Sequence, residues 1–180
     1  MNKSLLRKKL IDKRKKIKSE VMNINFKKVL NFLNQQQIKN LSIGGYYPYN
    51  NEVNCIDLLG LFEKKGYLIS LPKIKVNYQM DFYKWSKKYP LCINKYGIPE
   101  PVNNLKIIPN VLIIPLVGYD NNLYRLGYGG GFYDRYLGKL NRNKKILKIG
   151  LAYSFQKIRK IPTNKYDIKL DFIVTDKKIK

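Results

Sequence analysis

The chain has 180 residues, 44% of them hydrophobic, as expected of a globular domain and not of a disordered chain. No apolar run reaches roughly 18 residues and the charged N-terminus lacks the apolar core of a secretory signal, so we expect a cytoplasmic protein without a membrane span. Two cysteines and no histidine exclude a disulfide framework, histidine-based metal sites, and Ser-His or Cys-His nucleophiles.

The formal net charge of +24 has two interpretations. Lys and Arg could neutralise the phosphates of a nucleic acid. Alternatively the charge reflects a compositional bias, because Lys, Asn, Ile and Tyr are all abundant and the lysines are spread along the chain. We favour the second interpretation and expect no specific nucleic-acid partner, although a positive field would still attract small polyanions such as nucleotides or polyglutamates.

The N-terminal third reads as three helices. Residues 3–22 form the first, with apolar residues at helical spacing: Leu6, Leu10, Ile17 and Val21. A stripe of cations lies on the adjacent face, either as a solvated edge or as an anion site: Lys3, Arg7, Arg14 and Lys18. The second helix spans about 26–33, and the third runs from the capping residue Asn54 to Gly66.

Strands dominate the rest of the chain. They are predicted within 41–50 and at 67–72, 78–85, 111–117, 147–153 and 170–175, with a loop at 98–104 and a helix at 131–140. The run 111–117 is apolar throughout, which is typical of a central strand covered on both faces, although Pro115 counts against a long unbroken ladder. The alternation predicts an α/β fold: a single-domain sandwich over residues 1–180 with a mainly parallel central sheet flanked by helices.

The stretch RLGYGGGFYDRYL, residues 125–137, follows the buried strand and begins a helix. Glycine amides before a helix N-terminus can form an anion site, and Arg125 and Arg135 could add contacts to phosphate. Asp134 would repel a bare anion but suits a magnesium ion that bridges to phosphates. The Lys-Ser or Lys-Thr of a Walker loop and the third glycine of a dinucleotide fingerprint are both absent, so a flexible turn stays open as the alternative.

The whole phrase 125–137 closely resembles the C-terminal motif of the 5-formyltetrahydrofolate cyclo-ligase family. Weaker similarities to this family follow in the right order: KSLLRKKLIDKRK, YYPYNNEVN, YGIPEP, LAYSFQ and IPTNKYDIKLDFIVTD. The resemblance implies ATP- and Mg²⁺-dependent conversion of 5-formyltetrahydrofolate to 5,10-methenyltetrahydrofolate, ADP and phosphate. We expect a monomer that accepts the folate with or without a polyglutamate tail. An enzyme that uses the same loop on another acceptor, or a nucleic-acid-binding protein with this fold, stays open as an alternative.

The resemblance also assigns residues. The ATP-binding positions are Lys3, Ser4, Leu5, Leu6, Arg7, Arg125, Leu126, Gly127, Tyr128, Gly129, Gly130, Gly131, Phe132 and Tyr133, and Arg125 and Arg135 are the expected catalytic cations. Asp134 and Asp167 match magnesium ligands, Glu52 matches the carboxylate that binds the pterin edge, and Tyr47 matches a substrate-pocket position.

Trp85 and Tyr153 are our own additions to the substrate pocket, because a flat pterin favours aromatic faces; a place in the core is the alternative for both. The chain also departs from some relatives, which carry a basic residue where Tyr128 or Gly130 stands. A charge that steadies phosphates must then come from elsewhere, such as Arg125 or Arg7.

Overall fold

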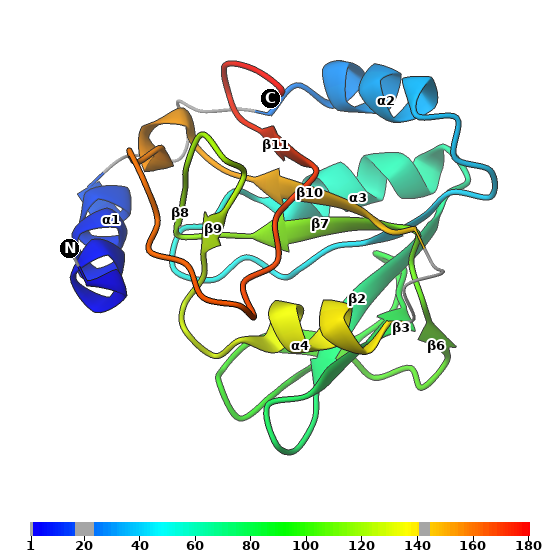
Figure 1. Ribbon diagram of the computed structural model, residues 1–180. Coiled ribbons are helices and arrows are strands. Elements are labelled where there is room, and N and C mark those ends of the chain that lie inside the picture. Colours follow the sequence, from blue (N-terminus) through cyan, green and yellow to red (C-terminus); the bar gives the residue numbers. More distant parts are fainter. Residues whose placement is uncertain (1, 17–23, 141–144) are drawn as a thin grey trace.

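The computed structural model describes residues 2–16, 24–140 and 145–180 (Figure 1). Its helices are α1 (Lys3–Lys16), α2 (Phe26–Gln35), α3 (Cys55–Lys64) and α4 (Phe132–Lys139), with a short 3₁₀ turn, η2 (Ser154–Gln156). The sequence predicts all four α-helices, and residues 17–22 of the first prediction lie outside the described residues. Asn25 and Asn54 accept hydrogen bonds from the first-turn amides of α2 and α3, so capping residues define both starts.

A seven-stranded sheet runs through the centre in the order β11-β10-β7-β1-β2-β3-β6. Its strands are β1 (Ser42–Gly44), β2 (Leu68–Ile74), β3 (Met80–Lys84), β6 (Lys106–Ile107), β7 (Val111–Pro115), β10 (Leu147–Leu151) and β11 (Phe172–Val174). The five strands from β11 to β2 are parallel, and β3 and β6 add antiparallel at one edge. The predicted α/β class with a mainly parallel sheet is confirmed.

Strand β7 explains why its sequence is apolar without interruption. Val111 and Ile113 face the core under α2 and α3, whereas Leu112 and Ile114 face the core under α4. Because both faces of the strand are covered, neither alternate position can be polar. The strand ends at Pro115, as the missing backbone N–H requires.

Helix α1 belongs neither to the layer of α2 and α3 nor to that of α4. It lies beyond the carboxyl ends of the parallel strands (Figure 1). Leu6 and Leu10 are buried against Val117, Leu126 and Ile161, which belong to segments that follow the sheet. The helix therefore covers the region where parallel sheets bind their ligands.

Residues 98–104 are not the plain loop predicted from the sequence. β5 (Pro99–Pro101) pairs with β4 (Leu91–Ile93) in a small antiparallel ribbon, closed by a turn in which Asn94 accepts hydrogen bonds from two later amides. A second ribbon, β8 (Gly118–Tyr119) with β9 (Arg125–Leu126), occupies the segment between β7 and the glycines. Both ribbons are too short for their alternation to be visible in the sequence.

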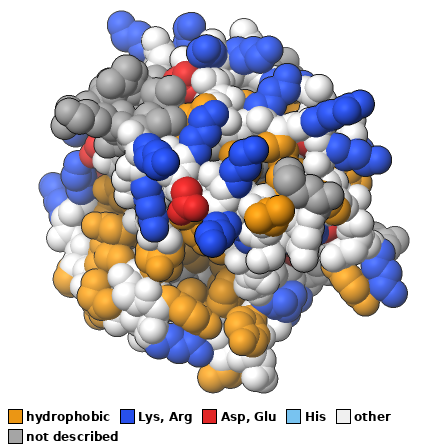
Figure 2. Space-filling view, turned by 90° about the vertical axis from the view of Figure 1, so that its left-hand side faces the viewer, with side chains coloured by type: hydrophobic (Ala, Val, Ile, Leu, Met, Phe, Trp, Pro, Cys, Tyr) orange, Lys and Arg blue, Asp and Glu red, His pale blue; other side chains and the backbone are white. Residues whose placement is uncertain are grey.

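The side of the molecule that carries α1 shows Lys and Arg side chains spread over its upper part and hydrophobic side chains gathered below them (Figure 2). The cations are dispersed over this face and do not form one stripe. Within residues 2–16, 24–140 and 145–180, no helix is both long and apolar enough to cross a bilayer.

Candidate functional site

A cleft of about 620 Å³ opens between α1, the segment after β1, the β2–β3 and β4–β5 turns, and the glycine stretch. This volume is within the range of small-molecule sites, roughly 300–1,000 Å³. Residues distant in the sequence meet here, from Lys3 at the start of the chain to Asp167 near its end. The cleft lies where the fold predicts a ligand, beyond the carboxyl ends of the parallel strands.

The glycine stretch forms one wall of the cleft. Gly129 and Gly131 have φ angles of 108° and 65°, values that L side chains rarely adopt, and Gly131 begins α4 without a side-chain cap. Among the described residues, no backbone carbonyl accepts a hydrogen bond from the amides of residues 127–131. Five successive amides before a helix N-terminus are therefore available to an anion.

Arg7 is fixed against this wall. Its Nε donates to the carbonyl of Gly127 at 2.7 Å. Its guanidinium atoms lie 3.4–3.6 Å from the position that a Cβ at Gly129 would occupy. The cationic side chain thus lies against the backbone at Gly127 and Gly129, so its charge would add to that of the amides if an anion bound there.

Arg125 is committed to neighbouring protein groups. Its Nη2 lies 2.6 Å from Asp134 Oδ1, and its Nη1 donates to the carbonyl of Ile168 at 2.6 Å. The amide of Ile168 donates to the same carboxylate oxygen at 3.1 Å. Arg125 lines the cleft, yet its main contacts hold Asp134 in place.

Asp167 is held in a similar way. Lys3 Nζ and the amide of Asn164 both lie 2.7 Å from Asp167 Oδ2. Burial raises the pKa of this carboxyl, but the hydrogen bonds from Lys3 and Asn164 outweigh burial, and the net pKa is lowered. Asp134 Oδ2 and Asp167 Oδ1 accept from no group in the described part of the chain, so each aspartate keeps one oxygen for a ligand.

Glu52 also lines the cleft, at the end of a tight turn. Asn50 and Asn51 both have left-handed backbone, with φ of 47° and 57°, which asparagine tolerates better than most residues. The turn folds Glu52 Oε2 back to 2.9 Å from the amide of Tyr49. The side chain is 8% exposed, and this burial raises its pKa to about 7.

Aromatic and aliphatic side chains line the rest of the cleft. Tyr78 and Tyr96, from the β2–β3 and β4–β5 turns, lie 5.9 Å and 6.1 Å from Phe132 between ring centroids. Sequence reasoning missed both tyrosines. The only available signal was the YGIPEP segment, which contains Tyr96. No pattern in the sequence marks Tyr78, because a turn residue is directed by the hairpin that carries it.

Residues 1–176 match the family model described as "5-formyltetrahydrofolate cyclo-ligase family". The chain belongs to this family. The 5-formyltetrahydrofolate cyclo-ligase of Mycoplasma pneumoniae is 34% identical over 185 residues, covering 98% of this chain and 99% of its own, and that of Haemophilus influenzae is 34% identical over 78% of both chains. The solved structure of the 5,10-methenyltetrahydrofolate synthetase of Aquifex aeolicus superposes with a TM-score of 0.78 at 33% identity, covering 99% of this chain and 92% of that one.

Within this family assignment, most of the expected site residues meet in the cleft. Glu52, Tyr47 and Asp167 line it together with the whole stretch from Arg125 to Asp134. Of the segment 3–7, only Lys3 and Arg7 line it. Ser4 and Leu5 are exposed and Leu6 is buried in the core, because successive helical residues point in different directions.

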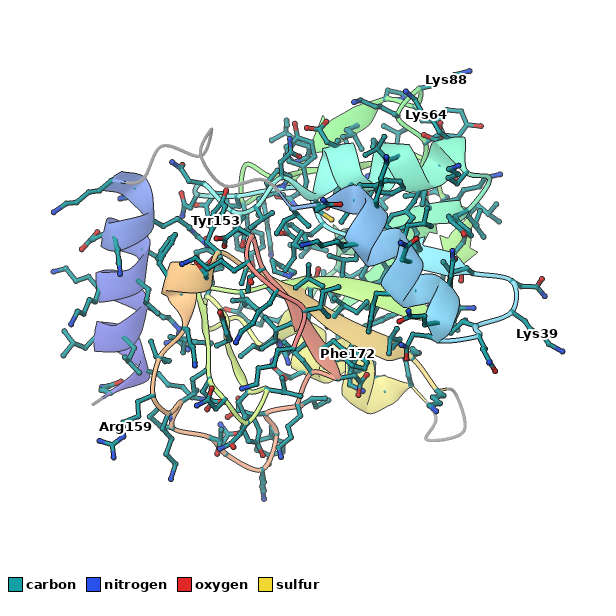
Figure 3. All side chains as sticks on the ribbon, turned by 90° about the horizontal axis from the view of Figure 1, so that it is seen from above. Lys39, Lys64, Lys88, Tyr153, Arg159 and Phe172 are labelled. Carbon is teal, nitrogen blue, oxygen red and sulfur yellow. The ribbon has the colours of Figure 1, made fainter. Side chains whose placement is uncertain are left out.

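Three further expected site residues also lie outside the cleft lining. Arg135 donates to the carbonyls of Gly130 and Tyr78 and is not among the residues that line the cleft. Trp85 and Tyr153 are each 5% exposed and belong to the core beneath α2 and α3. Tyr153 lies inside the molecule, whereas Lys39, Lys64 and Lys88 lie at its periphery (Figure 3). Neither aromatic side chain is assigned to the cleft.

Proposed function

We propose that this chain is a 5-formyltetrahydrofolate cyclo-ligase, which converts 5-formyltetrahydrofolate and ATP to 5,10-methenyltetrahydrofolate, ADP and phosphate. The proposal rests on one observation above all: bare glycine amides and a buried carboxyl, Glu52, face the same cleft. The amides suit a polyphosphate, and the carboxyl suits the N–H edge of a pterin.

The nucleotide binds to the glycine wall in this proposal. The amides of residues 127–131 and the guanidinium of Arg7 contact its phosphates. Arg125 keeps Asp134 in position beside them. Arg135 acts on the nucleotide indirectly, because its hydrogen bond to the carbonyl of Gly130 orients the glycine loop.

Asp134 and Asp167 are proposed to hold Mg²⁺. No group of three or more candidate metal ligands occurs among the described residues, but magnesium in nucleotide sites commonly takes only one or two carboxylates and completes its shell with phosphates and water. The spare oxygen of each aspartate fits that requirement. The ion would neutralise charge on the transferred phosphoryl group.

The reaction needs no protein nucleophile. The formyl oxygen attacks the γ-phosphorus of ATP and ADP leaves. The folate N10 then attacks the activated formyl carbon, phosphate departs with the former formyl oxygen, and N10 loses its proton. The residues of the cleft supply positioning and charge, which are the main contributions to phosphoryl transfer. A chain without histidine can therefore carry out both steps.

The absorbance of the methenyl product in the near ultraviolet gives a direct test. The purified protein should form this product only when 5-formyltetrahydrofolate, ATP and Mg²⁺ are all present. Glu52→Gln should raise the KM for the folate by about tenfold or more, since a carboxylate makes the stronger hydrogen bonds, and should leave the KM for ATP within about twofold. No turnover with the complete mixture would reject the proposal.

The proposal extends to a monomer that works in the cytoplasm and accepts polyglutamylated folates. The net charge of +24 supports the last point, because a positive field raises the local concentration of polyanionic substrates.

A further inference from the structure

Arg14 is a buried cation that the proposed function leaves without a role. Its side chain lies at the C-terminal part of α1, and the residue is 2% exposed. Its Nη1 donates to the carbonyl of Leu116 at 3.3 Å, and its Nη2 donates to the hydroxyl of Tyr128. A buried guanidinium is costly unless it is paired, and Arg14 Nε has no hydrogen-bond partner among residues 2–16, 24–140 and 145–180, so the contacts of Nη1 and Nη2 carry the pairing of this cation.

Tyr128 connects this cation to Tyr49, which also lines the cleft. The residue stands between Gly127 and Gly129, in the middle of the proposed phosphate wall. Arginine can only donate, so the Tyr128 hydroxyl accepts from Arg14 and donates to the carbonyl of Tyr49 at 3.3 Å. The two tyrosine rings also meet edge to face, with centroids 5.7 Å apart.

The connection ends at Glu52. The amide of Tyr49 donates to Glu52 Oε2, so the residue that receives the hydrogen bond of Tyr128 also fixes the buried carboxyl. Tyr46, Cys55, Tyr128 and Tyr133 are the neutral titratable groups around this carboxyl. Arg14 is the cation whose field opposes the effect of burial on Glu52.

We propose that Arg14 and Tyr128 are positioning residues that couple the nucleotide wall to Glu52, so that nucleotide and folate bind cooperatively. The inference rests on the proposed function of the cleft. Phosphates bound to the amides of residues 127–131 fix the backbone of Tyr128. Its hydroxyl then fixes Tyr49, and through Tyr49 the carboxyl that receives the folate. Such coupling is reciprocal, so folate must favour nucleotide to the same degree.

The experiment measures the Kd of the magnesium complex of a non-hydrolysable ATP analogue, with and without saturating 5-formyltetrahydrofolate. The ratio of the two constants is the coupling factor. We expect a factor of about fivefold or more in the unmodified protein, the lower end of typical allosteric coupling. Tyr128→Phe removes the hydroxyl and keeps the ring. Arg14→Lys keeps the charge and loses the two-pronged guanidinium donor. Each variant should bring the coupling factor to within about twofold of one.

Lys9→Met serves as the matched control, because it removes an exposed cation from the same helix and should leave the factor unchanged. A factor near one in the unmodified protein, or an unchanged factor in Tyr128→Phe, would overturn the coupling role. Tyr128→Phe decides the question if Arg14→Lys fails to fold. Turnover of the unmodified protein in the complete assay mixture separates the two claims. If the unmodified protein is active and Tyr128→Phe leaves the coupling factor unchanged, only this inference is rejected. If the unmodified protein is inactive, the proposed function is rejected.

Discussion

Asp134 and Arg125 close the glycine loop at its base. Arg125 Nη2 lies 2.6 Å from Asp134 Oδ1, and the two side chains are 6% and 26% exposed. Arg125 is the first residue of β9 and Asp134 lies in the first turn of α4, so their ion pair holds together the two ends of residues 126–133. The two ends of a glycine-rich loop are thereby fixed before any ligand binds, which lowers part of the entropy cost of ordering the residues between them.

Asp134→Asn should lower kcat by about 100-fold, the usual scale for losing one electrostatic contact at a phosphoryl-transfer or acyl-transfer site. It should also raise the Mg²⁺ concentration needed for half-maximal rate, because an amide is a weaker ligand than a carboxylate. The measurement is initial rate against Mg²⁺ concentration. Asp57→Asn, at an exposed aspartate on α3, is the control and should match the unmodified protein. An unchanged magnesium dependence would remove Asp134 from the metal site.

Gly129→Ala should weaken binding of Mg-ATP by about tenfold or more while the protein stays folded. The φ of 108° is unfavourable for alanine, so the backbone should relax and turn its amide away from the phosphates, whereas the new Cβ would meet Arg7 only at ordinary contact distance. Gly66→Ala is a matched control, because its φ of 84° carries a similar strain and no atom lies within 4 Å of the new Cβ. Both variants should lose about 1–3 kcal/mol of unfolding free energy. Equal nucleotide affinity in the two variants would contradict the role of the glycine wall.

Glu52 should make stability depend on pH. Its pKa is raised from 4.5 to about 7 in the folded protein, so the native state binds more protons than the unfolded state between these values. Stability should therefore fall as pH rises from about 4.5 to about 7, by at most about 3 kcal/mol. In Glu52→Gln this loss should disappear. The unfolding free energy of the variant should therefore rise relative to that of the unmodified protein between pH 5 and pH 8. Urea unfolding at the two pH values measures the difference, and parallel curves would show that Glu52 is not desolvated.

Trp85→Phe should affect stability and leave folate binding alone. Trp85 packs in the core under α2 and α3, and its buried Nε1 has no hydrogen-bond partner among residues 2–16, 24–140 and 145–180. A smaller ring should cost about 1–2 kcal/mol of unfolding free energy, and the KM for the folate should stay within about twofold. A KM raised tenfold with unchanged stability would return Trp85 to the pocket.

The sequence by itself determined the features that depend on local chain properties. The apolar run around Val111–Pro115 required a strand covered on both faces, and Asn54 and Gly66 delimited α3. The glycine stretch predicts an anion site, because glycine leaves the backbone amides accessible and can adopt left-handed backbone, as Gly129 and Gly131 do. The resemblance carried by residues 125–137 is confirmed by the match over residues 1–176.

Only the tertiary structure decided which side chains meet. Trp85 and Tyr153 are aromatic and plausible for a pterin, yet the sheet buries both in the core. Arg14 appeared as one cation of a helical stripe, and docking of α1 on the strand ends buried it against Tyr128. Contacts such as those between Arg14, Tyr128 and Tyr49 join segments separated by 79 to 114 positions. Periodicity reports only the direction of a side chain from its own element, and the partner in that direction is set by how the elements pack.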